Sequence, residues 1–147
     1  MSFNESAERQ AIKTVVDVFS NLADDKRVAE QMPLFTQDAA VNTYIGGELV
    51  FAMKGHGEIS KVFTDYLAQF SKVYHLNGQQ TVDFQSETEA RAVSYCLVKL
   101  VGETDGKPGL LEHSVRYQDR FVKEADGQWR IAERTAEFLI SETRTLA

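Results

Sequence analysis

The sequence predicts an α+β domain in which three helices pack on a curved, mostly antiparallel sheet. Apolar residues recur at helical spacing in the first half of the chain, whereas strand-like runs follow from Lys72 onward. No linker rich in proline, glycine or serine divides the 147 residues, so we expect one domain over residues 1–147. Helices that precede an antiparallel sheet in the chain cover one of its faces.

The helices are expected over residues 5–22, 25–32 and 55–70. Asn4, or Ser2 together with Glu5, can cap the start of the first helix. The second ends before Pro33, because the residue that precedes a proline disfavours helical geometry. The apolar stripe of the first helix is Ile12, Val15, Val16, Phe19 and Leu22. That of the third is Ile59, Val62, Phe63, Tyr66, Leu67 and Phe70.

The strands begin with a short hairpin, residues 38–44 and 49–53, which turns at Gly46 and Gly47. Four longer strands follow. The first covers residues 73–84 and carries a bend or bulge at Gly78. The second, residues 90–101, is apolar on both faces and therefore central. After a turn region at residues 102–109, the last two strands are joined at Asp126 and Gly127.

One face of the strand that starts at Leu111 combines apolar side chains with a carboxylate. Alternation places Leu111, His113, Val115, Tyr117, Asp119 and Phe121 on the same side. Burial of an unpaired carboxylate is costly, so we expect Asp119 to have a partner or to line a polar pocket. The alternative is a buried network of Tyr117 and Asp119 that braces the sheet. At ~3.4 Å per residue, His113 lies ~20 Å from Asp119 and cannot pair with it.

Composition excludes several classes of protein. The net charge is -6 and no basic run occurs, which disfavours nucleic acid and anionic membranes as partners. No apolar run approaches the ~18 residues that span a bilayer. The single cysteine, Cys96, allows no internal disulfide and fits the reducing cytoplasm, where we expect it to be buried. The three histidines lack paired metal-ligand spacing and no nucleotide motif occurs, so we expect neither metal nor cofactor.

Several segments together resemble one known superfamily. They are residues 34–39, Gly55 at the start of the third helix, His75, residues 89–92, and above all residues 116–119 with 126–131. Over nearly its full length the chain resembles the SnoaL-like branch of the nuclear transport factor 2-like superfamily. That branch is related to scytalone dehydratase, bile-acid dehydratase, polyketide cyclase and ketosteroid isomerase. The resemblance implies a cone-shaped fold with an interior ligand pocket and a homodimer formed through the exposed face of the sheet.

The chain also departs from these relatives. The position of the isomerase aspartate falls near Thr43, and the first helix has no tyrosine to polarise a carbonyl. The tyrosine of the dehydratase Tyr…Asp pair is absent, since the corresponding region contains Phe19, Asp24 and Asp25. We expect the two aspartates to form a solvated helix cap. The dehydratase-like histidine is kept as His75.

His75 is the principal catalytic candidate. A histidine with an unperturbed pKa of ~6.5 can accept a proton as a general base and return it as an acid. Alternation places His75 on the same strand face as Asn77 and Gln79. The candidates that would hold a substrate oxygen or protonate a leaving hydroxyl are Tyr44, Tyr117 and Asp119. The candidates that would line the pocket are Phe19, Phe35, Gln79, His113 and Trp129.

The sequence is therefore compatible with two functions. The first is a cofactor-free acid–base enzyme, a dehydratase, isomerase or cyclase, acting on a small hydrophobic hydroxylated or carbonyl compound. The second is a non-catalytic module of the same fold that binds a small molecule or a protein, which the missing tyrosine and displaced aspartate favour. An enclosed cavity of at least ~300 Å³ that contains His75 favours the enzyme, and a filled interior favours the module.

Overall fold

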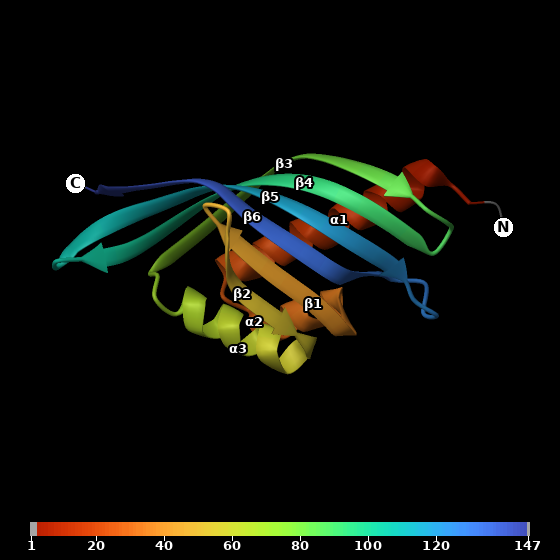
Figure 1. The fold of residues 1–147 in the computed structure, drawn as a ribbon, viewed down its shortest axis with the longest axis horizontal. Coiled ribbons are helices and arrows are strands. Elements are labelled where there is room, and N and C mark those ends of the chain that lie inside the picture. The colour runs from red at the N-terminus through yellow and green to blue at the C-terminus, as the bar shows by residue number, and fades with distance from the viewer. Residues whose placement is uncertain (1–2, 147) are drawn as a thin grey trace.

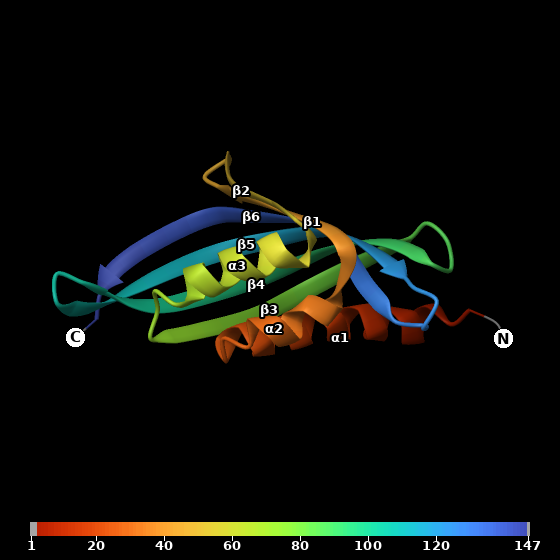
Figure 2. The same cartoon turned by 90° about the horizontal axis from the view of Figure 1, so that it is seen from below.

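A computed structural model gives the structure of residues 3–146, apart from the side chain of Thr104. Three helices lie on one face of a curved six-stranded sheet, which confirms the predicted α+β class (Figures 1 and 2). The helices are α1 (Glu5–Asp24), α2 (Val28–Gln31) and α3 (Gly55–Leu67), and a 3-10 turn, η1 (Met32–Leu34), follows α2. The strands are β1 (Phe35–Ile45), β2 (Glu48–Lys54), β3 (Lys72–Phe84), β4 (Glu89–Thr104), β5 (Lys107–Lys123) and β6 (Trp129–Thr145).

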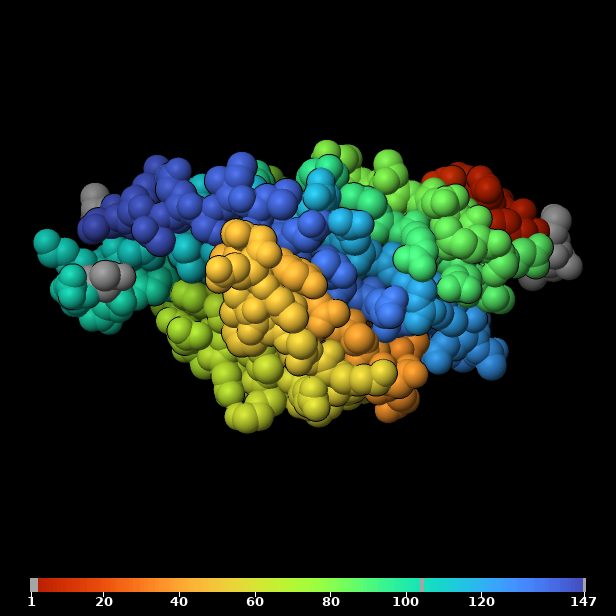
Figure 3. Space-filling view, viewed as in Figure 1, coloured from red at the N-terminus to blue at the C-terminus, as the bar shows by residue number. Residues whose placement is uncertain are grey.

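The strand order across the sheet is β2-β1-β6-β5-β4-β3. All neighbouring strands are antiparallel except β1 and β6, which run parallel. The last strand is therefore inserted between the early hairpin and the other long strands. Figure 3 shows the β1–β2 hairpin, in orange and yellow, packed closely beside β6, in blue. Helix α1 lies against β3, and α3 lies against β1 and β2.

The first helix is longer than its apolar stripe indicates. It is capped by Asn4, whose side-chain oxygen accepts a hydrogen bond from the Ala7 amide at 3.1 Å. Ser2, the other predicted cap, lies outside the described residues. At its far end α1 continues to Asp24, two residues beyond the predicted limit. The second helix is correspondingly shorter than predicted, and Pro33 lies within the 3-10 turn that follows it.

The prediction of a turn region over residues 102–109 is wrong. Strand β4 continues to Thr104 and β5 begins at Lys107, so the turn contains only Asp105 and Gly106. Both have positive φ, 53° and 77°, as a two-residue type I′ turn requires. This turn geometry matches the right-handed twist of the strands, so the hairpin can continue beyond the body of the domain. The predicted irregularity at Gly78 is confirmed by a register shift between Asn77 and Gln80.

The hydrophobic core fills the space between the sheet and the helices. Phe19 of α1 lies at its centre, with edge contacts to Phe35 at 6.0 Å and to Phe63 of α3 at 6.0 Å between ring centroids. Cys96 is buried as expected, and burial raises the pKa of its thiol to about 11. Within residues 3–146, no helix combines the length and apolar character needed to cross a membrane.

Candidate active site

A histidine–aspartate pair joins the end of α1 to β3. The Nδ1 atom of His75 lies 2.7 Å from Oδ1 of Asp24, and the side chains are 9% and 26% exposed. The additional residues at the end of α1 bring Asp24 over the sheet. The prediction that Asp24 is solvated is therefore wrong, because it was based on local sequence and could not include a partner 51 residues away. Asp25, which ends the helix, is exposed as predicted.

A second set of hydrogen bonds fixes α1 against β3 beside this pair. The side-chain amide of Asn77 donates to the backbone oxygen of Val16 at 3.3 Å and to Asp17 at 3.0 Å. Its oxygen accepts from the hydroxyl of Ser20 at 3.1 Å. Asn77 lies two residues from His75, and Ser20 lies one helical turn before Asp24. These bonds therefore set the position of the helix at the point where the pair forms.

His75 lines a cavity of about 100 Å³ between the helices and the inner face of the sheet. The lining is mainly apolar, and its polar side chains are Gln31, Thr43, Tyr66, His75, Tyr117 and Arg134. The remaining lining residues are Phe19, Ala23, Val41, Phe63, Leu67, Val98, Leu100, Ala136 and Phe138. The interior is therefore not filled, but the cavity is smaller than the ~300 Å³ typical of a ligand site.

Arg134 is the partner that Asp119 was expected to have. Its Nε and Nη2 atoms donate to the two carboxylate oxygens of Asp119 at 2.8 and 2.9 Å, and the two side chains are 1% and 0% exposed. The guanidinium also stacks on Tyr117, 3.8 Å from the ring centroid, and on Phe19 at 4.6 Å. Asp119 thus serves to neutralise and orient Arg134, which itself lines the cavity.

The third guanidinium nitrogen of Arg134, Nη1, has no partner in residues 3–146. Among the described residues, Nη1 is buried and donates to no hydrogen-bond acceptor, whereas Nε and Nη2 each donate to Asp119. A cationic donor held in an apolar cavity interacts strongly with any oxygen placed beside it. The site therefore combines a possible base, His75, with a fixed donor, Arg134.

Sequence analysis missed Arg134, although the chain contains a signal for it. Asp119 lies seven residues before Asp126, and Arg134 lies seven residues after Gly127. A hairpin with a two-residue turn there would place Asp119 opposite Arg134, and this is the observed pair. The observed connection is longer, so that Lys123 pairs with Trp129, and a register shift between Arg120 and Phe121 restores the counted register.

Two of the other predicted site residues line the cavity. Tyr117 is buried there, and burial raises the pKa of its phenol. Phe19 forms part of the apolar lining. Phe35 packs behind the cavity against Phe19 and Phe63. Tyr66, which sequence analysis assigned only to an apolar stripe, brings a second phenol to the lining, and burial raises its pKa as well.

Three predicted residues lie elsewhere in the structure. Tyr44 is on the opposite side of β1, beside Thr135 and Glu137, and its neighbour Thr43 faces the cavity instead. Gln79 is exposed, because the bulge at Gly78 moves it off the face that His75 occupies. The indole nitrogen of Trp129 donates to Glu8 at 2.6 Å, near the beginning of α1, where it joins the helix to the sheet.

His113 is buried beside the cavity lining. Its Nδ1 atom lies 2.7 Å from the hydroxyl of Ser141, and its ring packs against Phe138, with 4.6 Å between centroids. Among the described residues, Nε2 is buried without a hydrogen-bond partner. Burial lowers the pKa of His113 below its ordinary value, because an imidazolium would lose its hydration there.

The lowered pKa of His113 predicts a loss of stability in acid. The unfolded chain binds this proton near pH 6.5 and the folded chain only at lower pH, so stability is lost as the pH falls below 6.5. We expect His113→Asn to reduce the difference in melting temperature between about pH 7.5 and about pH 5 relative to the unmodified chain. If the melting temperature changes by the same amount in both proteins across this range, the loss of stability in acid does not come from His113.

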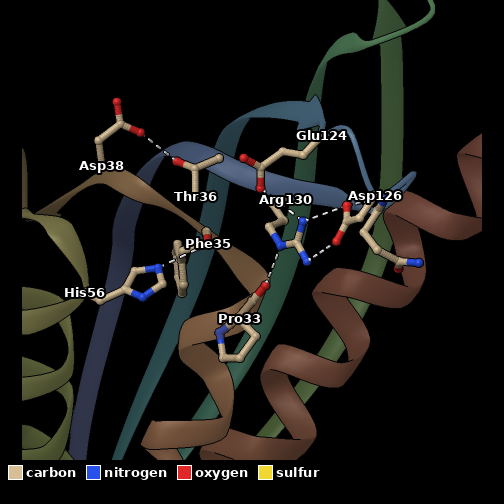
Figure 4. A network of polar contacts seen from close by, with 9 residues as sticks. Pro33, Phe35, Thr36, Asp38, His56, Glu124, Asp126 and Arg130 are labelled. Atoms are coloured by element: carbon tan, nitrogen blue, oxygen red, sulfur yellow. Dashed lines mark hydrogen bonds and ion pairs between the residues drawn. The ribbon is translucent and has the colours of Figure 1, made fainter.

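A separate polar network lies away from the cavity and is shown in Figure 4. Arg130 donates to Asp126 at 2.7 and 2.9 Å, to Glu124 at 3.1 Å and to the backbone oxygen of Pro33 at 2.9 Å. Nε2 of His56 lies 3.1 Å from the backbone oxygen of Phe35, to which it donates. These contacts join the β5–β6 turn to η1 and β1. His56 is therefore a structural residue at the start of α3.

Comparisons with known proteins agree with this architecture. No curated protein matches the chain by sequence. A protein from Novosphingobium aromaticivorans, provisionally named a scytalone dehydratase, is similar in structure: TM-score 0.81, 24% identity, 97% of this chain and 91% of that chain covered. The hexachlorocyclohexane dehydrochlorinase LinA-type3 from Novosphingobium barchaimii is also similar: TM-score 0.77, 14% identity, 97% and 92% covered.

ActVI-ORFA from Streptomyces coelicolor is similar as well, with a TM-score of 0.73, 20% identity, and coverage of 88% of this chain and 96% of that chain. At these identities the structural similarity establishes the fold alone. The sequence itself matches the family model described as a SnoaL-like domain over residues 4–135. The chain therefore belongs to the family of SnoaL-like domains, within the nuclear transport factor 2-like superfamily.

Proposed function

We propose that the chain is an acid–base catalyst that eliminates water, or another small leaving group, from a compact and largely apolar substrate. The observation that carries this proposal is the His75–Asp24 pair on an apolar cavity that also holds the free Nη1 donor of Arg134. The names of two similar structures, a dehydratase and a dehydrochlorinase, both denote eliminations and support this choice over isomerisation or cyclisation.

The contacts of the pair suggest how each group acts. Asp24 accepts a hydrogen bond from Nδ1 of His75, which leaves Nε2 as the nitrogen that takes a proton. In the proposed step Nε2 removes a proton from a carbon next to a carbonyl, and the C–H electron pair forms a carbon–carbon double bond. The hydroxyl on the adjacent carbon departs with its bonding pair and receives a proton, so that water leaves.

Arg134 would act on the substrate oxygen. As the proton leaves carbon, negative charge accumulates on the carbonyl oxygen, and a fixed cationic donor stabilises that charge more than it stabilises the ground state. The bidentate bond to Asp119 prevents the guanidinium from turning away. The phenols of Tyr66 and Tyr117 are the groups on the lining that could protonate the departing hydroxyl.

The size of the cavity favours a second candidate function. About 100 Å³ is below the ~300 Å³ typical of a ligand site, and so small a cavity favours a non-catalytic module of the same fold that binds a small molecule or a protein. In this case the His75–Asp24 pair would serve only to hold α1 against β3.

The experiment that separates the two candidates is hydrogen exchange in D₂O. Small 3-hydroxy ketones are first tested for binding by nuclear magnetic resonance, and compounds that bind are then followed for deuterium incorporation beside the carbonyl and for loss of water. Exchange or dehydration above the uncatalysed rate supports the enzyme. Binding without either reaction supports the module.

We also propose that two copies pair through the face of the sheet turned away from the helices. Leu76, Leu97, Ser114 and Ile140 lie side by side on four neighbouring strands. The three apolar members of this row are 55%, 52% and 66% exposed. Ion pairs between Arg116 and Glu137 and between Arg144 and Glu112 flank the row. An apolar centre with a charged rim is typical of a surface that binds another protein.

The pairing predicts that Leu97→Lys is monomeric while the unmodified chain is a dimer, as measured by sedimentation velocity. A charge at the centre of the interface would lose its water on association, which disfavours the dimer. Leu49→Lys is the matched control, because Leu49 is 53% exposed on β2 and outside the row. A monomeric unmodified chain, or a dimeric Leu97→Lys protein, would argue against this surface.

A further inference from the structure

Gln31 contributes a polar atom to the cavity that the proposed proton transfer does not use. The residue is the last of the short α2 helix, is fully buried and lines the cavity. Its side-chain nitrogen donates to the backbone oxygen of Phe19 at 2.9 Å. Within the described residues, its side-chain oxygen, Oε1, is buried and has no hydrogen-bond partner.

The orientation of the Gln31 amide follows from its contacts. The backbone oxygen of Phe19 can only accept a hydrogen bond, so the group that faces it must be the NH₂ end of the side chain. Rotation of the amide would place two acceptors against each other. Oε1 is therefore the free atom, and it presents an acceptor rather than a donor.

The cavity thus contains an acceptor and a donor that do not satisfy each other. Within the part of the chain that the structure describes, Oε1 of Gln31 and Nη1 of Arg134 are both buried and both without a hydrogen-bond partner, and both residues line the same space. A buried polar atom without a partner is costly, and such atoms are rare in native proteins. A bound molecule that donates a hydrogen bond to Gln31 and accepts one from Arg134 would satisfy both atoms.

We propose that Gln31 is a specificity-determining residue that accepts a hydrogen bond from a hydroxyl group of the substrate. This inference rests on the proposed function of the cavity as a ligand site. It narrows the substrate class to compact, mainly apolar molecules that carry a hydroxyl, and it excludes analogues in which a methyl group replaces that hydroxyl. Such an analogue would fit by shape but would leave Oε1 buried against carbon.

The size of the discrimination follows from the cost of that unpaired acceptor. A site that hydrogen-bonds a substrate hydroxyl rejects the analogue without it, because the site's own polar group is then left unsatisfied. The cost of one neutral unsatisfied group corresponds to a preference of roughly 5- to 100-fold.

Phenol and toluene are suitable probes, because they share one ring and differ by a hydroxyl in place of a methyl group. A single ring is also about the largest apolar body that a cavity of this size admits, since a 150 Å³ cavity is known to bind benzene. Dissociation constants are measured by calorimetry for the unmodified chain, for Gln31→Met and for Gln10→Met. Gln10→Met is the matched control, since it makes the same substitution at an exposed residue of α1 outside the cavity lining.

We expect the unmodified chain and Gln10→Met to bind phenol roughly 5- to 100-fold more tightly than toluene, and Gln31→Met to lose this preference. The comparison within the unmodified chain remains valid even if Gln31→Met does not fold. Equal affinities, tighter binding of toluene, no binding of either probe, or a preference that survives in Gln31→Met would each overturn the inference.

The probes also separate this inference from the proposed function. Neither phenol nor toluene reacts, so their binding does not require His75 to act as a base. Selective binding of phenol in a chain that catalyses no exchange would remove the proposed catalysis and leave the role of Gln31 intact. Catalysis in a chain that shows no preference for phenol would support the proposed function and overturn the role of Gln31.

Discussion

Replacement of His75 by alanine should lower the turnover number by a factor of roughly 10² to 10⁴, the usual contribution of a positioned base, while the melting temperature changes little. His75 is the imidazole on the cavity lining, and its Nδ1 atom is already bound to Asp24. Asp24→Asn should also lower turnover, because the amide no longer favours the imidazolium that forms when the base accepts a proton.

The measurement uses steady-state rates with a compound that shows exchange or dehydration with the unmodified chain. His56→Ala is the matched control, since His56 lies in the separate network at the start of α3 and outside the cavity lining. Full activity in His75→Ala would assign the base to another residue. Loss of folding would show that His75 is a structural residue.

Replacement of Asp119 by alanine should cost about 3–5 kcal/mol in the free energy of unfolding, the largest effect on stability that we expect. The side chains of Asp119 and Arg134 are 0% and 1% exposed, so the change leaves a buried guanidinium without its counter-ion. Loss of one partner is more damaging than loss of both, because it is the uncompensated charge that is costly.

Urea unfolding of three variants tests this prediction. Asp119→Ala should shift the midpoint strongly, whereas the double variant Asp119→Leu with Arg134→Met should recover much of the loss because no charge remains buried. Asp126→Ala is the matched control, since Asp126 forms a two-bond ion pair with Arg130 at the surface and should matter far less. Similar losses in Asp119→Ala and Asp126→Ala would show that burial does not set the energy of the Asp119–Arg134 pair.

The architecture could be predicted because it depends on periodic patterns. The apolar stripes of α1 and α3 and the alternation along β5 follow from helical and strand geometry, and the structure confirms both. The bulge at Gly78 could also be predicted, since a glycine inside a strand often marks one. The exposure of Gln79 that results from this bulge could not be predicted, because the sequence does not show how many residues the bulge inserts.

The candidate site was less predictable, because it depends on contacts between distant segments. The position of Asp24 depends on where α1 ends. The helix ends in a Schellman motif, in which Lys26 has a positive φ of 57° and the amides of Lys26 and Arg27 donate to the backbone oxygens of Ala23 and Leu22. No glycine marks this end in the sequence. Gln31 and Arg134 appeared as ordinary polar residues, since burial at those positions depends on how helices pack on the sheet. Tyr44 and Thr43 differ only in which side of β1 they occupy, and a register error of one residue exchanges their roles.

The position of β6 in the sheet has a consequence for synthesis on the ribosome. The chain emerges from its N-terminus, so β1 and β2 are made first and β6 is the last strand to appear. Until then the early hairpin and the β3–β4–β5 layer have no strand between them. Arg134, which lies on β6, joins the cavity only at that stage. The cavity therefore cannot form until β6 has been made, and until then the edges of β1 and β5 that later pair with β6 are open.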